Sequence, residues 1–109
     1  MHCRITKINH KPDSLDDLLG YLKSVESDVN SIDGLHSVTM VNIGETESIA
    51  FSEYENEEQM NNAGEKYREI MGGMAQYFSG PPEMSDGDAI WSWSKLNINL
   101  IHTSKSLAK

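Results

Sequence analysis

The chain has 109 residues, 24% of them charged, and a formal net charge of −8. This length suits one domain with a single core. The negative charge argues against binding to nucleic acid or to an anionic membrane, because both require a basic surface. One cysteine, Cys3, excludes an internal disulfide framework. No apolar run reaches the roughly 20 residues of a membrane span, and residues 1–10 contain no signal-like core, so we expect an unprocessed cytoplasmic protein.

The first third of the chain predicts a strand and then an amphipathic helix. Residues 3–9, CRITKIN, are rich in β-branched side chains, which favours a strand. Asp13 or Ser14 is placed to cap a helix. The pair Asp33–Gly34 predicts its end. Between them, apolar residues recur at steps of three and four, the pattern of an amphipathic helix: Leu15, Leu18, Leu19, Leu22, Val25, Val29 and Ile32.

Residues 35–43 and 48–54 predict a β-hairpin, because two strand-like segments flank the turn sequence GETE. Neither segment alternates strictly between apolar and charged residues, as a strand with one solvent-facing side does. We therefore expect both faces of this sheet to be at least partly buried.

A second helix is predicted over residues 55–78, and a last strand over residues 89–94, AIWSWS. Gly72–Gly73 lies inside the helix at a cost of about 1 kcal/mol per glycine relative to alanine, so we expect a break or bend there. Trp91 and Trp93 fall on one face of the last strand. The helix is predicted from an apolar stripe: Met60, Ala63, Tyr67, Ile70, Met71, Met74, Tyr77 and Phe78.

This order of elements predicts an α+β, ferredoxin-like βαββαβ fold over residues 1–95, with a C-terminal extension, either an extra strand or a tail, at residues 96–109. Both helices then cover one face of a four-stranded antiparallel sheet. The other face is too apolar for water, so we expect a second copy of the chain to cover it in a dimeric α/β barrel. Trp91 and Trp93 are expected either in the helix-facing core or between the two sheets.

The helix EQMNNAGEKYREIMGGMAQYFSGPPEM, the acidic-glycine turn SDGD and the closing AIWSW resemble small proteins related to the antibiotic-biosynthesis-monooxygenase domain, within the dimeric α/β-barrel proteins. The resemblance covers about residues 3–94 and rests on element order and texture, not on a sharp motif. It implies a homodimer with a ligand pocket between sheet and helices or inside the barrel. Some relatives are cofactor-independent monooxygenases of aromatic, polyketide-like substrates, others degrade haem, and many have no known activity.

Haem-degrading relatives use an asparagine near the end of the first strand, with a tryptophan and a histidine on or near the second helix. Asn9 matches the first position, but residues 55–78 contain neither tryptophan nor histidine. Haem breakdown is therefore not expected, and no cofactor is expected. His2, His10 and His102 are dispersed near ends and turns, without a second ligand at short spacing, so no metal site is expected either.

His36, Asn9 and Tyr54 are the candidate catalytic residues. His36 lies early in a strand, where it can orient a substrate or accept a proton; a structural histidine, bonded to the backbone or at an exposed strand end, is the alternative. The predicted pocket residues, several of which core packing explains equally well, are Val38, Met40, Phe51, Tyr67, Met71, Trp91 and Trp93.

Arg4 and Lys7, the cations of the first strand, predict cross-strand charge pairs, with contact to an anionic ligand as the alternative. Two functions remain open. One is a monooxygenase-like enzyme that orients an electron-rich aromatic or polyketide-like substrate toward oxygen. The other is a non-catalytic module for small-ligand binding or assembly, with a filled dimer core. A pocket of several hundred Å³ with a few converging polar groups favours the enzyme.

Overall fold

The computed structural model describes residues 1–95, so the predicted extension at 96–109 lies outside the described residues. No helix in the described part is long and apolar enough to cross a membrane. The predicted βαββαβ order is confirmed. In chain order the elements are β1 (His2–Asn9), α1 (Leu15–Ser24), α2 (Glu26–Asn30), β2 (Leu35–Gly44), β3 (Glu47–Tyr54), α3 (Glu57–Asn62), α4 (Gly64–Met74), the single-turn helix η1 (Ala75–Tyr77) and β4 (Glu83–Asp88).

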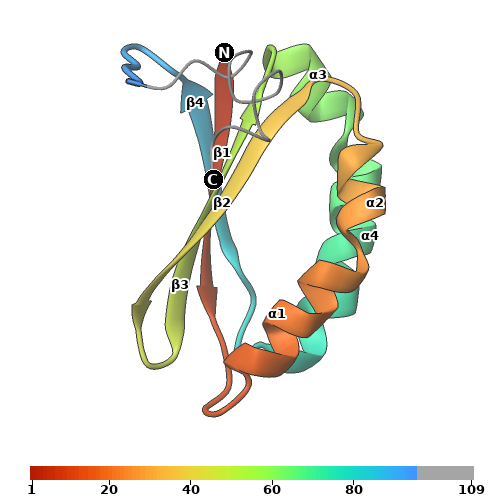
Figure 1. Cartoon of the computed structure of the whole chain (residues 1–109), viewed down its shortest axis with the longest axis vertical. Helices are drawn as coiled ribbons and strands as arrows, with labels where there is room; N and C mark the ends of the chain where they lie inside the picture. Colours follow the sequence, from red (N-terminus) through yellow and green to blue (C-terminus); the bar gives the residue numbers. More distant parts are fainter. Residues whose placement is uncertain (96–109) are drawn as a thin grey trace.

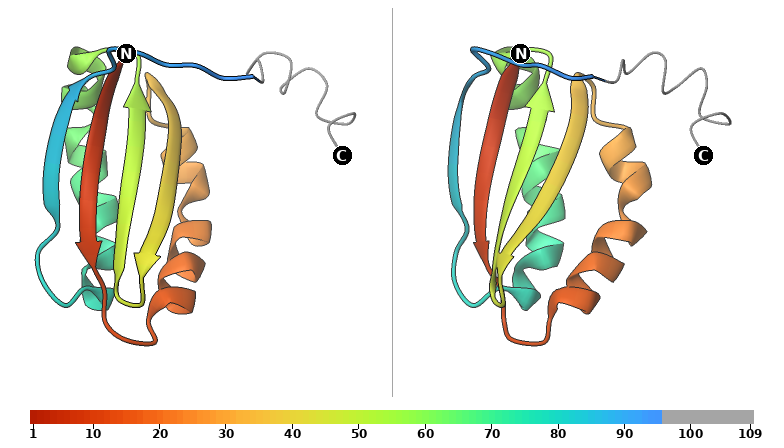
Figure 2. Two further views of the ribbon diagram at one scale, coloured as in Figure 1. Left: turned by 90° about the vertical axis from the view of Figure 1, so that its left-hand side faces the viewer. Right: turned by 60° about the vertical axis from the view of Figure 1, so that its left-hand side comes forward.

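The four strands form one antiparallel sheet in the order β2-β3-β1-β4. The helices lie together on one face of it (Figure 1). The other face is open in the described chain, as the left view of Figure 2 shows. The two central strands β1 and β3 pair with Ile5 opposite Phe51. These features confirm the predicted ferredoxin-like layer of helices on a sheet.

Each of the two predicted helices is divided in two by a turn, and neither turn lies at the glycine pair where the sequence predicted a break. α1 and α2 meet at Val25, and α3 and α4 meet at Ala63. The expected break at Gly72–Gly73 is wrong, because α4 runs through both glycines to Met74. Packing explains this difference, since α4 places Gly73 directly against Tyr21 of α1, where a glycine is needed for close approach.

The first helix begins where the sequence predicted, but the predicted capping hydrogen bond is not formed. Ser14 occupies the N-cap position without a capping hydrogen bond. Its hydroxyl instead donates to the Lys11 carbonyl oxygen at 2.6 Å and closes the preceding turn. A capping bond exists at α3, where the Asn56 side chain accepts from the Gln59 N–H at 2.8 Å.

The predicted last strand at residues 89–94 is wrong. The edge strand is β4, Glu83–Asp88, and it includes the SDGD sequence that was expected to form a turn. Ser79 N–H donates to the Asn9 carbonyl, which brings the chain back beside the end of β1. From there β4 pairs with β1 until Asp88 lies opposite His2. Residues 89–95 therefore lie beyond the sheet, and we call them the C-terminal arm.

The covered face of the two central strands is unusually polar, whereas the open face carries large apolar side chains. Strict alternation along β1 and β3 separates the two sets. On the covered face lie His2, Arg4, Thr6 and Ile8 of β1 with Ser48, Ala50, Ser52 and Tyr54 of β3. On the open face lie Ile5, Ile49 and Phe51, joined by Val41 of β2.

Two separate apolar clusters hold the helices on the sheet. The first joins Ile8 to Leu18 of α1, Met74 of α4 and Phe78. The second joins Tyr54 to Met60 of α3 and to Ala63. They lie at opposite ends of the layer between sheet and helices, because Ile8 and Tyr54 are at opposite ends of the covered face.

Gly72 and Gly73 provide a matched test of the α1–α4 contact. A methyl group at Gly73 would overlap the Tyr21 ring and displace its hydroxyl from the Ile70 carbonyl, a hydrogen bond of 2.9 Å. Gly72 has open space around it. We expect Gly73→Ala to lower the free energy of unfolding by about 1–3 kcal/mol and Gly72→Ala to raise it by about 0.5–1 kcal/mol. Urea denaturation of both variants measures this, and equal effects would contradict the contact.

Candidate functional site

A groove of about 440 Å³ runs between the helices α1 and α2 and the edge strand β2. The right view of Figure 2 shows these elements side by side. Its volume falls within the range of about 300–1,000 Å³ typical of small-molecule sites. Its lining combines an apolar floor with a polar rim: Leu22, Glu26, Val29, Asn30, Leu35, His36, Ser37, Val38 and Met40.

Behind the groove lies an apolar cavity of about 80 Å³ between the sheet and the helices. The groove and the cavity share five lining residues, so they form one continuous site: Leu22, Val29, Leu35, Val38 and Met40. The cavity lies between the two apolar clusters. It exists because the covered face there carries the short side chains of Thr6, Ala50 and Ser52, which cannot fill the space beneath the helices.

Hydroxyl groups provide the polar atoms of this cavity. The Thr6 Oγ1 and the Tyr67 hydroxyl are hydrogen-bonded at 2.6 Å. Ser52 and Tyr54 also line the cavity. Burial raises the pKa of the Tyr54 phenol, and neighbouring Tyr67 adds to this, while the positive charge of Arg4 opposes it. Tyr54 is therefore a neutral phenol at physiological pH.

Arg4 is a buried cation beside the cavity. Its guanidinium lies 3.7 Å from the ring centroid of Tyr67 and 5.5 Å from that of Tyr54. Nη2 donates to the Met60 carbonyl oxygen at 3.4 Å, whereas Nη1 is buried without a hydrogen-bond partner in the described chain. Stacking on tyrosine stabilises a desolvated guanidinium by about 2 kcal/mol. The predicted charge pair is wrong for Arg4, which has no ion pair among residues 1–95, while Lys7 pairs with Glu47 at 3.0 Å.

The structure brings five of the predicted site residues together. Tyr54 and Tyr67 line the cavity from β3 and α4, and Met71 joins them. Val38 and Met40 line both the cavity and the groove. These positions are far apart in the sequence, and alternation along each strand places them on the covered face.

His36 lies at the groove rim, in an irregularity of β2 between Leu35 and Ser37. Its Nε2 is 2.9 Å from the Glu55 carboxylate, and its Nδ1 is 3.1 Å from the Met1 sulfur. The ring is partly exposed and does not line the inner cavity. His36 can therefore contact a ligand that enters the groove, but it does not reach the hydroxyl groups inside.

The remaining predicted residues lie elsewhere. Asn9 is at the far end of β1, where its backbone carbonyl accepts from Ser79. Phe51 is on the open face of the sheet. Trp91 and Trp93 lie on the C-terminal arm and are 81% and 70% exposed, so neither belongs to the helix-facing core. Arg4, for which the sequence left contact with an anionic ligand as an alternative, lies beside the cavity, stacked on the Tyr67 ring.

No family model matches the chain, and no curated protein matches it. Solved structures do. A protein of unknown function from Nitrosomonas europaea is 15% identical, with a TM-score of 0.72 over 88% of this chain and 95% of that one. A candidate antibiotic biosynthesis monooxygenase from the same organism is 12% identical, with a TM-score of 0.70 over 84% and 100%. A variant of SnoaB, a cofactor-independent oxygenase from Streptomyces nogalater, is 6% identical, with a TM-score of 0.70 over 84% and 94%.

The chain has the ferredoxin-like fold of the antibiotic biosynthesis monooxygenases. The predicted resemblance is confirmed at this level, because the aligned regions span most of each chain. At identities of 6–15% the likeness concerns the fold alone. What the site does must be inferred from the side chains that line it.

The buried Tyr54 phenol predicts a change in stability at alkaline pH. Its raised pKa in the folded state means that this group's stabilisation is fully present below the unfolded value of about 10 and is lost as the pH rises through the higher folded value. We expect tyrosinate absorbance to show a late titration step in the wild-type chain. Tyr54→Phe should remove this step and reduce the alkaline loss of stability, whereas Tyr77→Phe should retain both. Persistence of the step in Tyr54→Phe would contradict the assignment.

Proposed function

We propose that the chain binds a small, largely apolar or aromatic molecule in the continuous groove and cavity, and that it works as a homodimer. The observation that carries this proposal is the union of a 440 Å³ groove with an apolar cavity that contains paired hydroxyl groups. Such a site gives a flat apolar ligand both a contact surface and a few orienting hydrogen bonds. Met40 and Met71 line it with flexible side chains that adapt to ligand shape.

We further propose that the bound molecule is an electron-rich aromatic substrate that is oxygenated without a cofactor. In such a reaction the substrate supplies all four electrons that reduce O₂: in a quinol, the ring becomes a quinone, one C–H becomes C–OH with one oxygen atom, and the second atom of O₂ leaves as water. A hydroxyl group of the quinol must first lose a proton to water in the open groove. The Arg4 charge, 3.7 Å from the Tyr67 ring, lowers the energy of the resulting anion. SnoaB, whose fold is similar, is itself a cofactor-independent oxygenase.

A non-catalytic binding module is the second candidate, and the composition of the cavity favours it. The residues that line the cavity include no histidine, carboxylate or lysine, so Tyr54 and Tyr67 are the titratable groups there. A phenol hydroxyl is a much weaker base than an imidazole or a carboxylate. The nearest imidazole of the groove is His36 at the rim. Oxygen consumption therefore distinguishes the two candidates.

The proposed homodimer is supported by the open face of the sheet. Ile5 and Phe51 pair across β1 and β3, and Val41 pairs with Ile49 across β2 and β3, so four apolar side chains are adjacent. Ile5 and Phe51 are each 38% exposed and Val41 is 41% exposed. Lys7 borders this patch opposite Ile49, and Glu83 lies beyond Lys7 on the edge strand β4, so an apolar centre with charged residues beside it has the arrangement of an interface.

The C-terminal arm gives this interface a second element. Ala89 N–H donates to the Met1 carbonyl oxygen, and the arm then crosses the end of the sheet (Figure 2). It carries two exposed tryptophans and an Ile90 that is 96% exposed. Each tryptophan can bury on the order of 200 Å². We propose that Trp91 and Trp93 pack against the partner subunit, because residues 1–95 of the same subunit leave both rings largely exposed.

Phe51 and Leu19 provide a matched test of the homodimer. Both side chains are partly exposed, at 38% and 48%, so a charge at either position stays in water in the monomer. We expect the wild-type chain to sediment as a dimer and Phe51→Glu to weaken dimerisation by at least about tenfold. Leu19→Glu, on the outer side of α1, should leave the dimer intact. A wild-type chain that is monomeric at micromolar concentration would exclude the homodimer.

Val38 and Leu19 provide the corresponding test of the ligand site. Val38 lines the groove and is 50% exposed, so a larger side chain there fills the groove without overpacking the core. Anilinonaphthalene sulfonate is a suitable fluorescent probe, because it combines aromatic rings with an anionic group. We expect Val38→Trp to lower its affinity by at least about tenfold, and Leu19→Trp to leave it unchanged. Equal binding by both variants would contradict the proposed site.

Oxygen-electrode measurements with a naphthoquinol then test the enzyme. We expect oxygen uptake above the uncatalysed rate with the wild-type chain, and loss of this excess in Val38→Trp. If the naphthoquinol binds but its oxidation is not accelerated, that substrate class is excluded. If no aromatic ligand that binds is turned over, the non-catalytic module remains.

A further inference from the structure

The imidazole of His2 is held in a cluster of carboxylates that the proposed function does not use. His2 is the first residue of β1 and is 4% exposed on the covered face. Its Nε2 lies 2.6 Å from Asp86 Oδ2, and its Nδ1 lies 2.8 Å from Asp88 Oδ1. Both acids come from the neighbouring strand β4, which pairs with β1. The cluster thus joins residues that are more than 80 positions apart in the sequence.

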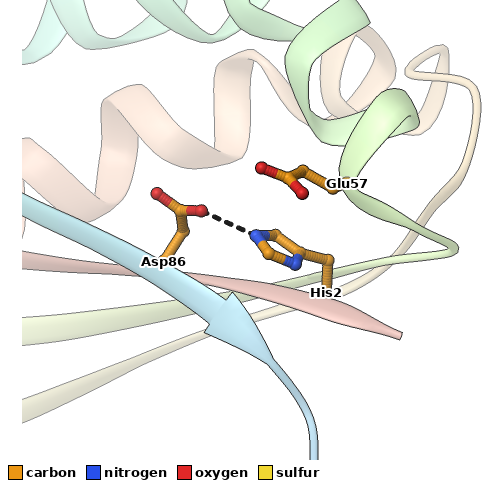
Figure 3. A group of neighbouring side chains, drawn as sticks. All are labelled: His2, Glu57 and Asp86. Carbon is orange, nitrogen blue, oxygen red and sulfur yellow. Dashed lines mark hydrogen bonds and ion pairs between the residues drawn. The ribbon is translucent and has the colours of Figure 1, made fainter.

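Three side chains in this cluster direct potential metal-ligand atoms toward one point. They are His2, Asp86 and Glu57 of α3, and their ligand atoms lie within 4.8 Å of one another. Figure 3 shows both carboxylates beside the imidazole edge. Two ligands of a tetrahedral zinc ion are about 3.4 Å apart, given bond lengths of about 2.0–2.2 Å. Because Nε2 and Asp86 Oδ2 are 2.6 Å apart, an ion between them requires the Asp86 carboxylate to move back, and exposed Glu57 to rotate toward it.

Asp88 occupies the position that supports a metal-binding histidine. In metal sites the second ring nitrogen usually donates to a carboxylate, which fixes the orientation of the imidazole. The Nδ1–Asp88 bond does this for His2 and directs Nε2 toward Asp86 and Glu57. Arg4, the next covered-face residue of β1, directs its guanidinium to Tyr67 and Met60 instead of pairing with Asp86.

The charge balance of the cluster also favours a cation. Three carboxylates surround one imidazole, so the group is negative even when the ring is protonated. A divalent ion replaces the proton on Nε2 and neutralises more of this charge than the proton does.

We propose that His2, Asp86 and Glu57 form a binding site for one divalent transition-metal ion, with zinc as the probe. One imidazole and two carboxylates suit Zn²⁺, and three protein ligands leave a fourth position open to water or a small anion. The sequence did not indicate this site, because its ligands are dispersed along the chain: β1–β4 pairing brings His2 and Asp86 together, and α3 brings Glu57 to them.

Glu57 and Glu58 provide the matched test. Glu57 makes no hydrogen bond to His2 or Asp86, so Glu57→Gln should fold as the wild type does. Glu58 is its exposed neighbour on α3 and is not one of the three ligands. In calorimetric titrations with zinc chloride, on full-length protein without a histidine tag, we expect one ion per chain. Glu57→Gln should weaken zinc binding by at least about tenfold, and Glu58→Gln should not.

A second set of variants separates the site from other histidines. His2→Gln and Asp86→Asn should abolish the one-ion stoichiometry, and His36→Gln should retain it. Should His2→Gln fail to fold, the nitrogen resonances of His2 in the wild-type chain give the same information, because zinc should shift Nε2 far more than Nδ1. Absence of binding at millimolar zinc, equal binding by Glu57→Gln and Glu58→Gln, or an unshifted Nε2 would each overturn the proposal.

Discussion

The distribution of polarity across the sheet determines most of the other features of this protein. In a sheet covered on one side, the apolar residues normally face the helices. Here the covered face carries Thr6, Ala50 and Ser52, while Phe51 and Ile5 lie on the open face. The buried apolar contacts between helices and sheet are consequently concentrated in the two end clusters, and a cavity remains between them. The open face in turn exposes apolar surface that a partner would bury.

The same distribution separates the parts of the fold that the sequence predicted from those it did not. The pattern of apolar and β-branched residues identified β1, the hairpin and both helical regions, and a clear spacing of apolar residues marked the helices. It failed for β4, whose sequence EMSDGD is polar and wholly exposed. That strand is held by backbone pairing to β1 and by the hydrogen bonds of its Asp86 and Asp88 carboxylates to His2. Neither kind of contact leaves a hydrophobic pattern in the sequence. The tryptophans suggested a strand at residues 89–94, but β1 begins at His2, which already pairs with Asp88, so no residue of β1 remains to pair with them.

The candidate site was only partly predictable for a related reason. Five predicted residues do lie together at the site: Val38, Met40, Tyr54, Tyr67 and Met71. Strand alternation and helical spacing can be read from the local sequence, and they were enough to assign the face on which each of these side chains lies. The position of His36 depends on an irregularity in β2, and that of Arg4 depends on two tyrosines from distant elements. The cavity itself arises from side chains too small to meet the helices. The sequence does not show which small side chains will face a gap, because this depends on how the helices pack on the sheet.

One strand therefore organises the chemistry of this chain. Along the covered face of β1, His2 lies among carboxylates, Arg4 lies between tyrosine rings, and Thr6 bonds to Tyr67 inside the cavity. Apolar residues at these three positions would have enlarged the core. Burying polar side chains there lowers the stability of the fold, so the requirements of packing do not account for them. Arg4 contributes to this cost in stability, because its guanidinium is buried without an ion pair among residues 1–95 and its Nη1 has no hydrogen-bond partner there. The proposed binding of an electron-rich ligand gives this cost a reason, since a fixed positive charge beside aromatic rings would favour such a ligand.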